Sequence, residues 1–190
     1  LVSSVLFKSE SIGIFKIPPG TPSLGKWTTT PVVWKGCIRV IEQEDTDASG
    51  DKRACGLRLK LELYNKVTLN LLLEDFSEVE KETPWAEVWY NPFAHSDMEF
   101  FIGNDGQDTI ESTPELSKYY KITTQLPGTG YHPFHPMGKG PLLQVALGLK
   151  FDDPADAAAF SESLAIYRRR FQNYHDTALY EKQLRDLEQR

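Results

Sequence analysis

The clearest change of hydrophobic pattern in the chain lies between residues 142 and 171. An apolar run at 142–151 favours a β-strand, and from Pro154 onward apolar residues recur every three or four positions, as on one side of an amphipathic helix. Asp153 is a good N-cap for this helix, and Pro154 fits its first turn. The helix's apolar stripe needs a sheet to cover, and it consists of Ala157, Phe160, Leu164, Tyr167, Phe171 and Tyr174.

Upstream of the helix, alternating apolar and polar residues predict short strands. The clearest is 57–63, where four leucines alternate with charged residues. Asn65 is expected to turn the chain after it, and 74–82 to form an acidic loop. The remaining strands are predicted at 5–17, 34–41, 67–73, 85–90, 118–124 and 142–151. Seven antiparallel strands and one C-terminal helix fit a small barrel or orthogonal sandwich in which the helix covers an open end.

Three polar or glycine-rich segments, near 42–55, 94–116 and 127–140, interrupt these strands. We interpret them as long loops or insertions, and the second leaves room for a short strand around its apolar island at 98–102. The expected organisation is one domain over residues 1–173, followed by a charged helical extension at 174–190.

Composition and charge exclude some classes of function. The net charge of −6 argues against broad nucleic-acid binding, which depends on many Lys and Arg side chains neutralising phosphates. No apolar run approaches the roughly 20 residues that span a bilayer, so a soluble, cytosolic chain is expected. Cys37 and Cys55 lack metal-ligand spacing and are expected to be reduced core residues.

No catalytic pattern is evident. The chain has no Gly-x-Ser-x-Gly, no phosphate-cradling glycine loop and no His-Glu-x-x-His, so neither an enzyme nor a cofactor is expected. His132 and His135, with His95, are too few and too isolated to predict a metal site.

A set of short segments follows a recognisable order through residues 5–171. They are VLFKSESIGIFKIPP at 5–19, Lys26-Trp27, Pro31, WKGCIRV at 34–40, Trp85-Ala86, SKYY at 117–120, and GLKF at 148–151 followed by the helix to Leu164. In order and spacing these segments resemble the NECAP family, the adaptin-ear-binding coat-associated proteins of clathrin-mediated endocytosis.

The resemblance implies a pleckstrin-homology-like fold, the PHear domain of that family. It also implies a cytoplasmic endocytic accessory protein, recruited to clathrin-coated pits and vesicles, that contacts the membrane only through the coat. The implied partners are a clathrin adaptor complex, including its opened, phosphorylated core, and endocytic proteins with short motifs of the Phe-x-Asp-x-Phe type. Two positions depart from the family: Pro154 replaces a common arginine and Leu116 a serine, and no Trp-x-x-Phe motif follows Phe171.

Candidate contacts follow from the resemblance and from charge. The residues expected to contact an adaptor or peptide are Ser117, Lys118, Tyr120, Lys150, Phe151, Arg168 and Arg169. The arginines at 168–170, with the two lysines, could form a basic face for acidic groups, or could be solvated with their stems over apolar surface.

Two other features have open interpretations. Asn91-Pro92-Phe93 matches the ligand motif of EH domains but also suits an ordinary turn. The aromatic residues Tyr119, Tyr120, Trp85 and Trp89 could line a peptide groove, although in strands such residues more often pack in the core or in cross-strand pairs.

Two alternative functions remain from the sequence. A phosphoinositide-binding membrane module would need a basic cup, for which Lys16, Lys26 and Lys35 are widely spaced. A structural subunit would use the charged helix at 177–190 as a docking or coiled-coil arm.

Overall fold

The strands form one antiparallel sheet. The computed structural model describes residues 2–17, 31–44, 57–70, 78–90, 108–113, 117–128 and 144–189. The strands in these ranges are β1 (Val2–Lys16), β2 (Val32–Glu44), β3 (Leu57–Asn70), β4 (Glu78–Trp89), β5 (Ile110–Ser112), β6 (Tyr119–Gln125) and β7 (Gln144–Phe151), and they are followed by helix α2 (Pro154–Glu188). Their order in the sheet is β4-β3-β2-β1-β7-β6-β5.

The sheet closes on itself through β4 and β6. Glu87 pairs with Gln125 across these strands, and the Gln125 side chain donates from Nε2 to Glu87 Oε1 at 3.2 Å. β1 joins both halves of the sheet: it pairs with β2 from Val2 to Phe15 and with β7 from Ile12 to Lys16. Its register with β2 shifts after Val5, Ser9 and Ile14, and such irregularities bend a strand. The expected mainly antiparallel, pleckstrin-homology-like barrel capped by a helix is therefore confirmed.

The period-two pattern of β3 determines which of its faces is buried. Its four leucines are all buried, whereas Arg58, Lys60 and Glu62 between them are partly exposed. This strand was the clearest in the sequence because each inward position carries the same apolar residue type.

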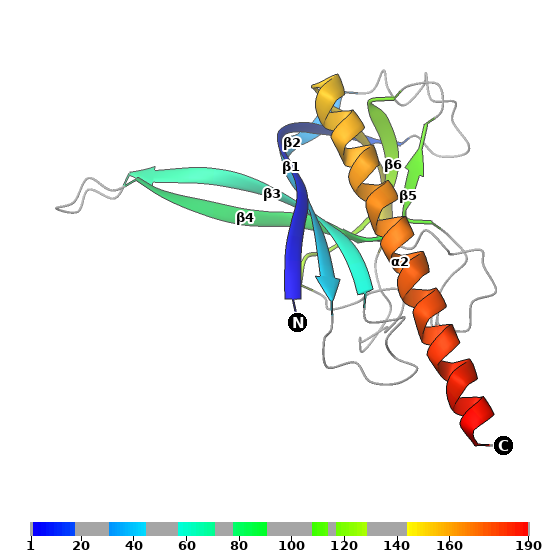
Figure 1. Ribbon diagram of the computed structural model, residues 1–190. Coiled ribbons are helices and arrows are strands. Elements are labelled where there is room, and N and C mark those ends of the chain that lie inside the picture. Colours follow the sequence, from blue (N-terminus) through cyan, green and yellow to red (C-terminus); the bar gives the residue numbers. More distant parts are fainter. Residues whose placement is uncertain are drawn as a thin grey trace.

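Helix α2 begins and packs as its sequence predicts. The Asp153 carboxylate accepts from the Ala155 N–H at 2.8 Å, and Pro154 occupies the first turn. All of the predicted stripe except Tyr174, which is partly buried, is buried against the sheet. Phe160 lies at its centre, with ring centroids 4.9 Å from those of both Phe151 and Tyr120. Figure 1 shows α2 crossing the strands and continuing beyond them.

Two polar contacts attach α2 to the sheet near residues 167–170. The Tyr167 hydroxyl donates to the Leu57 carbonyl at 3.2 Å in the core. One turn further, Arg170 Nη2 lies 2.9 Å from Glu42 Oε1. Burial raises the pKa of Glu42, and the Arg170 charge opposes that rise.

The described residues form seven strands, the number predicted, but not with the predicted boundaries. β3 continues without a break past Asn65 to Asn70, so the strands expected at 57–63 and 67–73 are partly one strand. Oriented by its neighbours, the Asn65 amide accepts from Trp34 Nε1 and donates to the Lys35 carbonyl, both at 3.1 Å, so its polar groups are satisfied without a turn. The seventh strand is instead β5, within the second insertion but after its apolar island.

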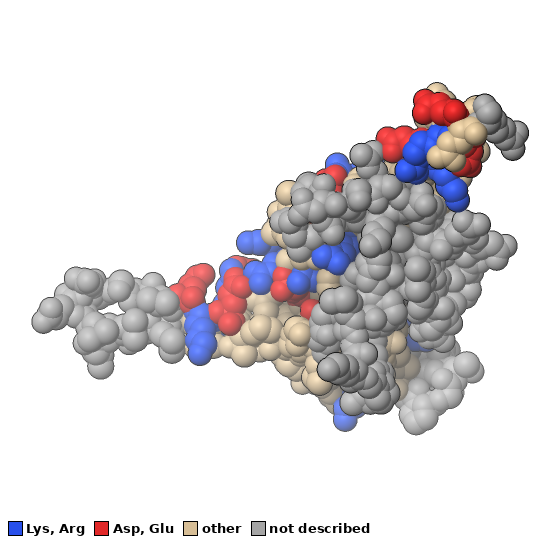
Figure 2. Space-filling view, turned by 90° about the horizontal axis from the view of Figure 1, so that it is seen from below, with Lys and Arg blue, Asp and Glu red and all other residues tan. Residues whose placement is uncertain are grey.

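The expected acidic loop is also partly a strand. Glu78–Glu82 belong to β4 and pair with β3, and the β3–β4 hairpin projects from the body of the molecule (Figure 1). Charges of both signs are interspersed along it (Figure 2). Arg39 bridges Glu62 at 3.3 Å and Glu82 at 2.9 Å near its base. These pairings leave no patch of a single sign on the described hairpin.

Candidate functional site

Two adjoining cavities form a groove between α2 and the strands β5 and β6, which we call the β5–α2 groove. The first has a volume of about 250 Å³ and the second of about 370 Å³. Ser112, Tyr120 and Ser161 line both cavities, so the two lie side by side.

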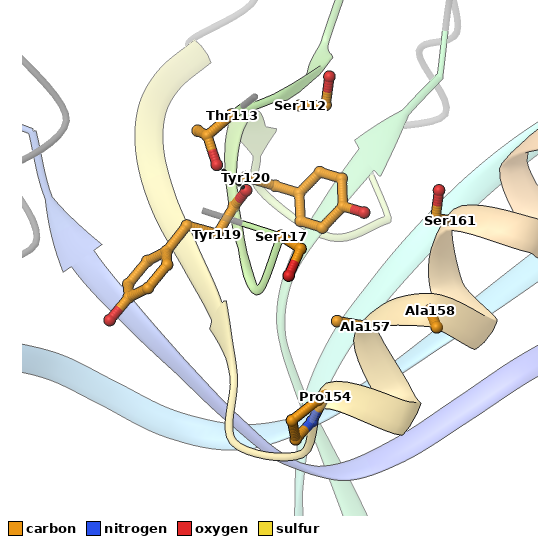
Figure 3. Close-up of a pocket in the computed structure, with 9 residues that line it drawn as sticks. All are labelled: Ser112, Thr113, Ser117, Tyr119, Tyr120, Pro154, Ala157, Ala158 and Ser161. Carbon is orange, nitrogen blue, oxygen red and sulfur yellow. Dashed lines mark hydrogen bonds between the residues drawn. The ribbon is translucent and has the colours of Figure 1, made fainter. Parts of the chain in front are cut away.

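Tyr120 forms the middle of the groove. Its ring points from β6 towards α2 and brings its hydroxyl near Ser161, whereas Tyr119 points to the opposite side, as adjacent strand residues do (Figure 3). Burial raises the pKa of the Tyr120 hydroxyl, and the neighbouring Ser161 side chain opposes that rise. On the helix side, Ala157 and Ala158 are small and leave the first cavity open (Figure 3).

The second cavity contains the charged groups. Arg168 Nη1 donates to the Tyr90 hydroxyl at 2.8 Å. Among the described residues no carboxylate oxygen lies within 4.0 Å of its guanidinium. Asp108 also lines this cavity, and burial raises its pKa to about 6 although it accepts from the Ile110 N–H at 3.1 Å. Since only the Tyr90 hydroxyl accepts from this guanidinium in the described part of the chain, further donors can bind a carboxylate or another planar anion.

The three consecutive arginines point in different directions because successive helical residues are about 100° apart. Only Arg168 lines the groove. Arg169 is exposed and lies 3.7 Å from Glu162 on the same helix, and Arg170 pairs with Glu42. Of the two interpretations left open by the sequence, a basic face shared by 168–170 does not form, and Arg169 does not line the groove.

The remaining predicted contacts separate as well. Phe151 is completely buried, which corrects its expected role as a contact: it is a core residue. Lys150 pairs with Tyr119 across β6 and β7, with its Nζ 6.0 Å from that ring's centroid, on the side away from the groove. Lys118 precedes β6, and its carbonyl accepts from the Phe151 N–H at 3.0 Å. The groove thus brings together Ser117, Tyr120 and Arg168 of the predicted set.

Sequence reasoning missed Tyr90, Asp108 and Ser161. Ser161 could have been found, because 157, 161, 164 and the predicted contact 168 follow helical spacing beside the buried stripe. Asp108 and Tyr90 are far apart in sequence and meet only through the closed sheet, so no local pattern indicates them.

The aromatic residues that could have lined a peptide groove mostly pack against other side chains. Trp85 stacks on Trp34, with ring centroids 4.5 Å apart and planes 10° from parallel. Trp89 and Tyr120 are buried. The cross-strand and core interpretations therefore hold for these three, and Tyr120 also presents its hydroxyl to the groove.

Several predicted features lie outside the described residues: Asn91, Pro92, Phe93, Cys55, Lys26 and the histidines at 95, 132 and 135. Within the described ranges, Cys37 is a buried free thiol, and no group of three His, Cys, Asp or Glu side chains is placed to hold a metal ion.

Comparison with models of known protein families gives no match, and neither does comparison with curated proteins. α2, the helix of the described chain, is not apolar enough to cross a membrane.

Proposed function

We propose that this domain is an endocytic accessory protein of the NECAP type that binds a segment of a clathrin adaptor complex in the β5–α2 groove and catalyses no reaction. The supporting observation is that three of the seven residues that the sequence predicts as contacts, Ser117, Tyr120 and Arg168, line the two adjoining cavities of this groove. The sequence segments that resemble the family support the choice of partner.

The chemistry of the groove favours an acidic segment. Within the described ranges Arg168 is held by the Tyr90 hydroxyl and pairs with no carboxylate, so it can bind an incoming acid without first breaking an ion pair with those residues. Asp108 and Glu111 line the same cavity and repel anions, but Glu111 lies 3.8 Å from Lys121 Nζ. We therefore expect one acidic side chain of the adaptor segment to pair with Arg168. Hydroxyl groups and apolar contacts of the groove would bind the rest of the segment.

The test is binding of the whole chain to purified adaptor cores, phosphorylated and not, measured by calorimetry. Arg168→Glu should weaken binding by about tenfold or more, because it replaces a charge-assisted hydrogen bond with a repulsion. Arg169→Glu is the matched control: it makes the same charge change one residue away, outside the groove. Equal affinities of the two variants would remove the proposed role of the groove.

A second candidate function is a docking arm formed by the end of α2. The helix runs to Glu188, and its exposed apolar residues Tyr180, Leu184 and Leu187 fall on one side. A partner helix could cover this stripe. Sedimentation of a chain ending at Asn173 tests this candidate: an unchanged assembly state and unchanged partner binding would eliminate it.

A further inference from the structure

Among the described strands, β5 is the last in the sheet, and it lies beside the groove. Within that part of the chain it pairs with β6 alone, in the register Ile110 with Ile122, Glu111 with Lys121 and Ser112 with Tyr120. The unpaired backbone groups of a strand at such an edge can pair with another chain.

The ladder determines which backbone groups of β5 face outward. The Thr123 N–H donates to the Thr109 carbonyl at 2.8 Å, so Thr109 and, two residues on, Glu111 point their N–H and C=O groups at β6. Ile110 and Ser112 then point theirs away from β6, at the strand edge beside the groove that both residues line. The outward side of β5 is therefore available for a second ladder.

The two residues differ in the hydrogen-bond partners of their outward backbone groups. The Ile110 N–H is already accepted by the Asp108 carboxylate at 3.1 Å. The N–H and C=O of Ser112 have no hydrogen-bond partner in the described part of the chain, and Ser112 is exposed. Ser112 thus presents one donor and one acceptor to the groove at the spacing that an added strand requires.

The opposite wall fits an extended chain. Between Ala157 and Arg168, α2 lines the groove over eleven residue steps, which is about 16 Å at 1.5 Å per residue, or about five residues of extended strand. The side chains that α2 contributes at Ala157, Ala158 and Ser161 are small, and the charged Arg168 lies at the other end of this segment.

We propose that the ligand of the β5–α2 groove binds by strand addition: an extended peptide of about five residues pairs its backbone with Ser112 and places a carboxylate at Arg168. Side chains of every second residue would then face Tyr120 and α2, and the intervening ones would face solvent. The inference rests on the proposed adaptor binding for its ligand and adds the mode in which that ligand is held.

The test removes one backbone donor and leaves the side-chain environment nearly unchanged. Ser112→Pro deletes the outward N–H, and the sheet tolerates it because that N–H makes no bond to β6. Ser112→Ala is the matched control, since it removes the hydroxyl and keeps the N–H. For binding to the purified adaptor core we expect Ser112→Pro to lose about tenfold in affinity and Ser112→Ala less than about twofold.

A second measurement does not depend on the folding of the proline variant or on the adaptor. Heptapeptides are selected from a random library on the wild-type chain, and each amide of a selected peptide is N-methylated in turn. Strand addition predicts that loss of affinity alternates with period two along the peptide, because only every second N–H faces β5.

The outcomes separate the two proposals. Full affinity of a folded Ser112→Pro variant, a methylation profile without alternation, or a library that yields no peptide dependent on Arg168 would overturn strand addition. Loss of adaptor binding in Arg168→Glu with none in Ser112→Pro would keep the adaptor proposal and remove only the binding mode. If the wild type does not bind the adaptor but library peptides give an alternating methylation profile, strand addition is kept and the adaptor proposal is removed.

Discussion

Phe160 is the side chain through which α2 is held to the sheet, and its truncation is the strongest single perturbation that we predict. The residue is completely buried, and its ring contacts those of Phe151 and Tyr120 at 4.9 Å and that of Phe7 at 6.1 Å. Phe160→Ala removes the ring from a site bounded by three other rings on a helix that is fixed at both ends of the contact.

The expected cost is large relative to the stability of the domain. Phe→Ala in a core costs about 3–5 kcal/mol, and the upper part of that range applies because the surrounding rings belong to separate elements and cannot all close on the cavity. A domain has about 5–15 kcal/mol of total stability. Phe160→Leu, which keeps most of the volume, should cost about 1.5 kcal/mol.

Urea unfolding followed by far-ultraviolet circular dichroism measures these differences. Glu162→Ala, on the exposed side of the same helix, should change the unfolding free energy by less than about 0.5 kcal/mol. A loss below about 1 kcal/mol for Phe160→Ala would mean that α2 is not packed on the sheet in solution, and the groove would lose one of its walls.

Three further variants test individual contacts by the same unfolding assay. Tyr167→Phe removes the hydroxyl that donates to the Leu57 carbonyl and should lower the free energy of unfolding by about 1 kcal/mol. An unchanged free energy of unfolding would mean that this hydrogen bond does not form in solution. Asp153→Ala removes the cap on Ala155 N–H and should also cost about 1 kcal/mol, whereas Asp153→Asn should cost little. The pKa of Asp108 is raised from 3.8 to about 6, so folding favours its protonated form and the wild type loses stability as pH rises from about 4 to about 6. Relative to Asp108→Asn, that loss should be on the order of 1 kcal/mol after solvent screening, and a difference independent of pH would contradict it.

The parts of the fold that depend on local periodicity were predictable. The leucines of β3 and the stripe from Ala157 to Phe171 each repeat within one element, so their buried faces follow from spacing alone. Phe151 shares the strand parity of the buried Leu149, so its core position could also have been derived.

The parts that depend on partners were not predictable. Asn65 has the local preference of a turn residue, but contacts with Trp34 and Lys35 in the neighbouring strand satisfy it inside β3. β5 is only three residues long and is defined by its pairing with β6, so its own sequence carries almost no signal. The same is true of the charged end of the groove, where residues 90, 108 and 168 meet only after the sheet closes.

Amide hydrogen exchange of the whole chain, with and without a purified clathrin adaptor core, tests the central claim most directly. The account predicts slower exchange on binding at 108–113, on the free edge of β5, with smaller changes along 157–168 of α2. Unchanged exchange at β5, with protection appearing instead on the projecting β3–β4 hairpin or on the end of α2, would contradict it.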